Sequence, residues 1–209
     1  MPLNVLALNC TLKPSTKDTK EPSSTQRLLS EFLAALGEYG AQGEIVRVAD
    51  LDIKPGVAAD EGGGDEWPAL REQVLASDIL VIGSPIWLGQ PSSVAKRVLE
   101  RMDAFLGERD AMQRMPTYGK VGLAVVVGNE DGAHHVAAEV NQALSEVGFT
   151  IPTGGVTYWV GEAMGGVNYV DLKKTPQAVA EWTPMLASCV AHLAKLLKEA
   201  PYPGRKAAG

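Results

Sequence analysis

The stretch IGSPIWLGQPSSVAKRVLERMD, residues 82–103, places a buried strand, an aromatic turn and a helix in direct succession. The apolar run that ends at Ser84 is typical of a strand covered on both faces, as in a parallel sheet. Trp87 stands in the turn, and Ser92 or Ser93 is the expected N-cap of the helix. The residues expected on the buried face of this helix are Val94, Val98, Met102 and Phe105. This order of elements predicts one unit of an α/β fold.

The same alternation extends in both directions along the chain. Further strands are predicted within residues 3–9, 43–51, 120–128 and 149–160, and further helices within residues 25–40, 68–78, 133–148 and 175–200. The closing helix is expected to kink or restart at Pro184 and to face inward through Trp182. The pattern predicts a parallel sheet with helices on both faces and right-handed crossovers. We expect a single domain over residues 1–200 and a frayed tail over residues 201–209.

Composition and charge narrow the classes of partner. A net charge of −6 argues against a nucleic-acid-binding surface, which is normally basic, and against a polybasic membrane anchor. No apolar stretch approaches the ~18 residues that span a bilayer, and residues 1–10 lack the basic region of a signal peptide. Cys10 and Cys189 have no CxxC partner, so we expect reduced thiols and a cytoplasmic location. Side chains of adjacent histidines rarely point the same way, so we do not expect His134 and His135 to bind a metal ion together.

Three loops follow the first, third and fourth main strands, and ligands of open α/β sheets bind where such loops meet at the carboxyl ends of the strands. They read NCTLKPSTKDTKEPSST, SPIWLGQPSS and GNEDGAHH. The first is rich in hydroxyls and leads into a helix N-terminus, which favours a phosphate, although an ordinary solvated loop has the same composition. The chain contains no GxxxxGKS/T, GxGxxG or GxSxG motif, so P-loop, Rossmann and α/β-hydrolase sites are not expected.

The other two loops allow two interpretations each. Ile86, Trp87 and Leu88 form an apolar wall for a planar ring, or Trp87 packs into the core at the end of its strand. The GNEDG loop presents backbone donors to the edge of a ligand, or it is an ordinary tight turn. All three loops at one edge of a single sheet indicate a binding site more strongly than any one of them alone.

In this arrangement the chain resembles a known family. SPIWLGQPSSVAKRVLERMD and GNEDG are similar to motifs of the flavodoxin-fold NAD(P)H-dependent flavin and quinone reductases, which include NADPH-dependent FMN reductases and Trp-repressor-binding-protein-like quinone oxidoreductases. The resemblance covers residues 3–197. It implies a flavodoxin-like α/β three-layer sandwich, with a five-stranded parallel sheet in the order 2-1-3-4-5. It also implies FMN as the cofactor, NAD(P)H as co-substrate and assembly as a homodimer or homotetramer.

The resemblance assigns cofactor-binding positions residue by residue. The positions that match the phosphate-binding residues are Thr11, Lys13, Ser24 and Thr25. The positions that would wrap the flavin ring and its ribityl chain are Pro85, Ile86, Trp87, Leu88 and Gly89. The positions that would close the other side are Gly128, Asn129 and Gly132. No catalytic residue is assigned, because a structural or exposed role explains His134, His135 and Tyr169 more readily.

Three positions depart from the family pattern. Cys10 replaces a glycine at the start of the phosphate loop, residues 14–23 are inserted within that loop, and Leu88 replaces the second aromatic of the turn. The cysteine could stiffen the loop. The insertion leaves open which hydroxyl reaches the phosphate, and stacking on the ring would rest on Trp87 alone.

The resemblance implies an oxidoreductase that passes a hydride from NAD(P)H through FMN to a quinone, a flavin or a similar small acceptor. Backbone N–H groups of residues 87–89 are expected to stabilise the negative charge of the reduced flavin. An electron carrier without NAD(P)H activity and an interaction module without cofactor are the alternatives on the same fold. A signalling receiver domain is excluded, because Asn9, Cys10 and residues 83–85 stand where it needs acidic residues.

Overall fold

A computed structural model of the chain describes residues 2–15 and 22–206. The strands are β1 (Leu3–Asn9), β2 (Ala41–Arg47), β3 (Ile79–Trp87), β4 (Gln90–Pro91), β5 (Val121–Gly128) and β6 (Val156–Val160). The α-helices are α1 (Ser24–Gly37), α2 (Trp67–Ala76), α3 (Ser93–Arg101), α4 (Ala133–Glu146) and α5 (Gln177–Glu199). Three short 3₁₀ helices are η1 (Val48–Asp50), η2 (Met102–Gly107) and η3 (Tyr169–Asp171).

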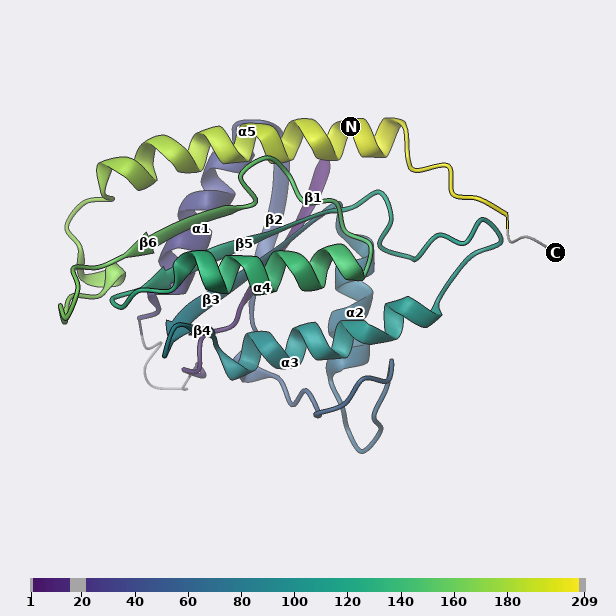
Figure 1. Cartoon of the computed structure of the whole chain (residues 1–209), viewed down its shortest axis with the longest axis horizontal. Coiled ribbons are helices and arrows are strands. Elements are labelled where there is room, and N and C mark those ends of the chain that lie inside the picture. Colours follow the sequence, from purple (N-terminus) through teal and green to yellow (C-terminus); the bar gives the residue numbers. More distant parts are fainter. Residues whose placement is uncertain (1, 16–21, 207–209) are drawn as a thin grey trace.

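The strands form one sheet in the order β2-β1-β3-β5-β6, and all neighbours in this order are parallel (Figure 1). Counted along the chain, these five strands have the order 2-1-3-4-5, so the predicted topology is confirmed. The two-residue strand β4 was not predicted. It pairs antiparallel with the end of β3 and makes a short hairpin at the carboxyl edge of the sheet.

Helices cover both faces of the sheet, because the side chains of its buried strands alternate between two apolar clusters. In β1, Leu6 and Leu8 belong to the cluster beneath α2, α3 and α4, whereas Val5 and Ala7 belong to the cluster beneath α1 and α5. Figure 1 shows these two helix layers on opposite sides of the strands. The carboxyl ends of the strands lie at the left of that view, where the predicted ligand-binding loops also lie.

Two serine N-caps begin the helices that lead away from this edge. Ser23 accepts a hydrogen bond from the Gln26 N–H and caps α1. Ser92 accepts from the Ala95 N–H and caps α3, and its hydroxyl donates to the Cys10 carbonyl at 2.6 Å. Ser92 was one of the two predicted candidates for its cap. The Ser92 contact also joins the loop after β1 to the loop after β3, so two walls of the predicted site are fixed to each other.

A buried ion pair holds the loop between η1 and α2. The side chains of Arg101 and Asp65 are both inaccessible to solvent, and the guanidinium lies 2.7 Å from the carboxylate. Arg101 also donates to the carbonyls of Lys54 and Ala58. Burial acts to raise the pKa of Asp65, but the hydrogen bonds from Arg101 and from backbone N–H groups outweigh it and hold that pKa well below its usual range.

Two lysines link the loops and strand starts at the amino edge of the sheet through hydrogen bonds and an ion pair. Lys198 near the end of α5 lies 2.8 Å from the Asp78 carboxylate and donates to the Pro2 carbonyl. Lys120 donates to the carbonyls of Leu75 and Ser77 at 2.7 and 2.8 Å. These contacts fix the starts of β1, β3 and β5 at the edge opposite the predicted site.

The closing helix differs from its prediction at Trp182, and at Pro184 it excludes one of the two predicted alternatives. Helix α5 continues through Pro184 as one element and does not restart there. Trp182 does not face the core: it is 39% exposed, and its indole N–H donates to the Val156 carbonyl at the edge strand β6. The edge position explains this, because β6 has no further strand for α5 to cover. Among the residues that the structure describes, no helix has the length and apolarity needed to cross a bilayer.

The predicted tail begins directly after α5. Within its described part, the Arg205 N–H donates to the Met112 carbonyl, and Arg114 donates to the carbonyl of Tyr202. Residues 207–209 of the tail lie outside the described residues.

Candidate functional site

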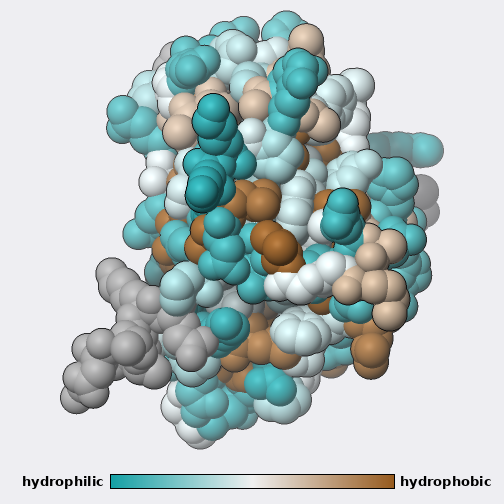
Figure 2. Space-filling model, turned by 90° about the vertical axis from the view of Figure 1, so that its left-hand side faces the viewer, coloured by the Kyte–Doolittle hydropathy of each residue, from teal (hydrophilic) through white to brown (hydrophobic). Residues whose placement is uncertain are grey.

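A cavity of about 420 Å³ opens at the carboxyl edge, between the loops after β1, β3 and β5 and the segment after β6. Figure 2 looks onto this side of the molecule, where apolar surface lies between hydrophilic side chains. The predicted site residues that line the cavity are Thr11, Lys13, Ser24, Thr25, Pro85, Ile86, Trp87, Gly128 and Asn129. The convergence of three distant loops follows from the parallel sheet, whose strands all end at this edge.

The loop after β1 is folded back onto the first turn of α1 by Asn9. This fully buried residue accepts a hydrogen bond from the Thr11 N–H and donates one to the Gln26 side chain at 2.9 Å. Thr11 in turn accepts from the Lys13 N–H. The loop therefore lies beside the helix N-terminus, whose first N–H groups have no partner within the helix and favour an anion. Residues 16–21, the middle of the predicted insertion, lie outside the described residues.

The hairpin after β3 supplies the apolar wall. Trp87 is 51% exposed and lines the cavity, so the interpretation that places Trp87 in the core is wrong. The next residues, Leu88 and Gly89, form the hairpin turn and both have positive φ angles, 52° and 74°. Leu88 is 90% exposed, and neither turn residue lines the cavity.

The loop after β5 approaches this hairpin closely at two glycines. A Cβ on Gly128 would lie 2.7 Å from the Ile86 side chain, and a Cβ on Gly132 would lie 2.7 Å from Gly89 Cα. Gly132 also has a φ of 124°, which glycine adopts without strain. Gly132 does not line the cavity, so the structure assigns Gly132 and Gly89 to the contact between the two loops.

A fourth wall was missed by the sequence analysis. It consists of Trp159 in β6 and the segment 168–171, and the rings of Trp159 and Tyr169 lie 5.3 Å apart between centroids. The Asn129 side chain donates to Asn168, which joins this wall to the loop after β5. One feature of the sequence could have identified Trp159 as a site residue: it is an aromatic residue at the end of a predicted strand. Within segment 168–171 the sequence analysis considered Tyr169 alone and favoured a structural or exposed role for it, because the segment has no regular periodicity; Tyr169 does line the cavity.

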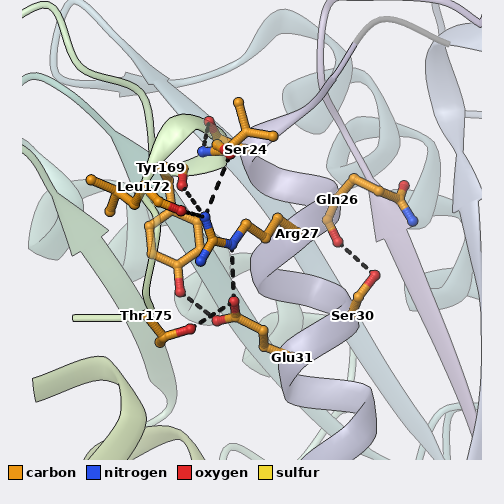
Figure 3. Close-up of polar contacts among 9 residues, drawn as sticks. Ser24, Gln26, Arg27, Ser30, Glu31, Tyr169, Leu172 and Thr175 are labelled. Carbon is orange, nitrogen blue, oxygen red and sulfur yellow. Dashed lines mark hydrogen bonds and ion pairs between the residues drawn. The ribbon is translucent and has the colours of Figure 1, made fainter. Parts of the chain in front are cut away.

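Helix α1 holds this fourth wall in place through a polar cluster (Figure 3). Arg27 donates to the carbonyls of Tyr169 and Leu172, both at 2.7 Å, and pairs with Glu31. Glu31 also accepts hydrogen bonds from the hydroxyls of Tyr169 and Thr175. Burial and the neighbouring Glu31 carboxylate raise the pKa of Tyr169 above its usual range, so its hydroxyl remains a neutral donor.

The first turn of α1 contacts the same wall. The Ser24 hydroxyl accepts a hydrogen bond from the Val170 N–H at 3.2 Å. Ser24 also lines the cavity, so one side chain joins the first turn of α1 to the fourth wall. It is one of the residues predicted to bind a phosphate.

Glu130 is a second residue that the sequence analysis did not select. It lines the cavity, and its carboxylate accepts a hydrogen bond from the Leu88 N–H at 2.9 Å. This N–H belongs to residues 87–89, whose backbone donors were expected to stabilise a reduced flavin. The structure shows instead that the Leu88 donor is occupied by a carboxylate of the chain itself.

Several remaining candidates lie apart from the cavity. Cys10 is buried in the cluster beneath α2, α3 and α4, and burial raises the pKa of its thiol. His134 contacts the Tyr158 hydroxyl, and His135 contacts Glu139, so each has a partner on the surface of α4 or β6. Within residues 2–15 and 22–206, no three His, Cys, Asp or Glu side chains are grouped in a way that could hold a metal ion.

Comparison with known proteins gives one family and several relatives. The sequence profile described as NADPH-dependent FMN reductase matches residues 3–165. The 8-demethyl-8-aminoriboflavin-5'-phosphate synthase of Streptomyces davaonensis is 34% identical, over 97% of this chain and 81% of the synthase. The divalent metal cation transporter MntH of Mycobacterium bovis is 41% identical over 81% of this chain, but the chain spans only 25% of the transporter's length.

Solved structures extend these similarities. RosB, crystallised with the bound intermediate 8-demethyl-8-formylriboflavin-5'-phosphate, has a TM-score of 0.86 and 34% identity, over 96% of this chain and 82% of RosB. An NADH:FMN oxidoreductase, EMOB, has a TM-score of 0.62 and 18% identity, over 92% of this chain and 89% of EMOB. At that identity the second similarity shows the fold alone.

Proposed function

Because the chain belongs to the NADPH-dependent FMN reductase family, we propose that it binds FMN in the cavity at the carboxyl edge and passes a hydride from NAD(P)H through the flavin to a small-molecule acceptor. The observation that carries this proposal is the convergence of nine predicted cofactor-binding residues on one cavity. A quinone, a free flavin and a nitroaromatic are the acceptor classes that we propose to test.

The residues around the cavity fit a flavin phosphate. Ser24 and Thr25 lie in the first turn of α1, and Thr11 lies in the loop that Asn9 folds back onto this turn. Backbone N–H groups and the helix dipole favour a phosphate there. Trp87 and Trp159 offer flat apolar surface for a ring system. The volume of about 420 Å³ lies within the ~300–1,000 Å³ typical of cofactor sites.

The protein's own contribution is to position and shield the flavin. When bound, FMN supplies a two-electron carrier, and hydride transfer to it needs a donor within ~3–3.5 Å of the ring. Trp87 is half-exposed at the rim, so one side of the proposed ring site remains open to a second substrate. Asn129 and the Arg27-held segment close the opposite side.

A second candidate function is chemical modification of a flavin phosphate. The Streptomyces davaonensis relative is described as a synthase of 8-demethyl-8-aminoriboflavin-5'-phosphate, and its similarity extends over 97% of this chain. In that function the flavin phosphate is the substrate, and it leaves the site altered at position 8. The cavity suits either function, because both require recognition of the phosphate and the ring.

One experiment distinguishes these functions. The purified chain is titrated with FMN and with riboflavin, and NADH and NADPH oxidation is followed with a quinone acceptor. The flavin is then released and weighed by mass spectrometry. We expect FMN to bind at least about tenfold more tightly than riboflavin because of its phosphate contacts, with turnover of NAD(P)H and an unchanged flavin mass.

Each other outcome has a defined meaning. An altered flavin mass would favour the synthase-like function, and FMN binding without NAD(P)H oxidation would favour an electron carrier. No FMN binding would defeat the proposal and leave an interaction module on this fold.

We further propose that the chain forms a homodimer or homotetramer and works in a reducing, cytoplasmic setting, in keeping with the free thiols of Cys10 and Cys189. Light scattering of the purified protein tests the assembly.

A further inference from the structure

A carboxylate from the loop after β5 holds the tip of the β3–β4 hairpin. Trp87 pairs with Gln90, so Leu88 and Gly89 form a two-residue turn in which both φ angles are positive. Such turns match the twist of the strands, but leucine adopts the left-handed conformation with strain. The 2.9 Å hydrogen bond from the Leu88 N–H to Glu130 is therefore a contact that holds this turn in place.

Glu130 also places a negative charge in the cavity. Its carboxylate lies beside the hairpin that supplies Trp87, the residue proposed to stack on the flavin ring. Lys13 lines the cavity from the loop after β1, beside the proposed phosphate site, and Asp171 lines it from the fourth wall. Among these three charged residues of the cavity, Glu130 is the one that the structure shows hydrogen-bonded to the Trp87 hairpin, through the backbone donor at Leu88. On the outer side of the hairpin, Gln90 contacts the His135 ring.

On the basis of the function proposed above, we propose that Glu130 makes this cavity discriminate between the redox states of its flavin and bind oxidised FMN more tightly than reduced FMN. Reduced flavin carries negative charge near N1, whereas the oxidised ring is neutral. A carboxylate in a partly buried cavity repels that charge, and the Leu88 N–H that would stabilise it is already engaged. The bound flavin then has a lower reduction potential than free FMN, so it donates its electrons more readily to the acceptor.

The test compares the dissociation constants of oxidised and reduced FMN, measured aerobically and under anaerobic dithionite. Glu130→Gln removes the charge and retains an oxygen that accepts from Leu88. We expect the wild-type chain to prefer oxidised FMN at least tenfold, and Glu130→Gln to lower this preference about tenfold, which equals about 30 mV for a two-electron couple.

Two control variants isolate the charge at this position. Asp131→Asn changes the adjacent carboxylate, which contacts the Gly132 N–H and does not line the cavity, and should leave the preference within about twofold. Glu130→Asp keeps the charge but shortens the side chain, and should retain the preference for oxidised FMN. Glu130→Asn replaces Glu130→Gln if the latter does not fold.

The outcomes separate the two proposals. A wild-type chain that binds reduced FMN as tightly as oxidised FMN would overturn the role of Glu130, and so would an unchanged preference in Glu130→Gln. In both cases FMN binding itself would still support the proposed function. A chain that binds neither form would refute the proposed function, and the role of Glu130 with it.

Discussion

Substitution of Trp87 should change ligand affinity with little effect on the stability of the fold. Its side chain is half-exposed and lines the cavity. We expect Trp87→Ala to weaken FMN binding by about 1 kcal/mol, or about fivefold, because the stacking surface is lost. The free energy of unfolding should change by no more than about 0.5 kcal/mol, as for most surface substitutions. Fluorescence titration and urea denaturation measure the two quantities.

Trp182 provides the matched control for this prediction. It is also partly exposed, but it lies at the edge of the molecule, where its indole N–H donates to the Val156 carbonyl. Trp182→Ala should therefore lower stability and leave FMN affinity unchanged. If both tryptophan variants lost affinity equally, the proposed stacking role of Trp87 would be wrong.

The Asp65–Arg101 pair governs stability away from the cavity. Asp65→Asn leaves a fully buried guanidinium without its counter-charge, so we expect a loss of about 3–5 kcal/mol in the free energy of unfolding. Asp52→Asn breaks the exposed Lys54–Asp52 pair and should cost no more than about 1 kcal/mol. Urea denaturation of both variants measures the difference. Equal losses would show that burial does not decide the effect.

The same pair predicts a pH dependence. The pKa of Asp65 is lower in the folded chain than its unfolded value near ~3.9, so its ionised form stabilises the fold above about pH 4. That contribution is lost as pH falls toward the folded pKa. Wild-type stability should consequently decline more steeply than that of Asp65→Asn below about pH 4, as measured by thermal unfolding at several pH values.

Segment 161–175 contains residues 168–171, which form part of the fourth wall of the cavity. It has no long periodic element of its own and is held by Arg27 and Glu31 from α1 (Figure 3). Tyr169→Phe removes one donor to Glu31, and we expect a loss of about 1.5–3 kcal/mol in stability. Re-ordering the loosened wall should cost about 0.5–1.5 kcal/mol on binding, so FMN affinity should fall about two- to tenfold.

Tyr202→Phe is the control for that element. The Tyr202 hydroxyl also makes a single hydrogen bond, to Thr150, but it lies at the opposite edge of the sheet. Its loss should leave FMN affinity unchanged in calorimetric titration. An equal fall in affinity for both variants would show that general loosening of the fold, and not the α1 contact, explains the Tyr169 effect.

The sequence predicts the strands and helices better than it predicts the side-chain contacts between them. Continuous apolar runs such as LNVLALN indicate buried strands, and the order of strands and helices predicts where their loops meet. The fourth wall depends on Arg27 reaching a carbonyl 142 residues away, and no local pattern encodes that distance. Glu130 was missed for the same reason, because its partner Leu88 lies 42 residues earlier. Strand β4 is too short for any periodic signal.

At the scale of the whole molecule, ligand binding and folding are linked. At FMN concentrations of about 100 times the dissociation constant, we expect a gain of about 2.7 kcal/mol in stability and a rise of about 5–11 °C in Tm. Riboflavin at the same concentration should give a smaller rise. Calorimetry measures both, and a single transition would also support the predicted single domain over residues 1–200. Equal shifts for the two flavins would contradict the proposed phosphate site.

The lysine contacts at the amino edge have a consequence for protein engineering. Lys198 and Lys120 fasten the strand starts at the end of the molecule farthest from the cavity. The register of the strands is that of their backbone ladders, which lie between these contacts and the loops around the cavity. Chimeras that receive these loops from a relative should retain the scaffold, so ligand choice can be transplanted while the framework stays unaltered.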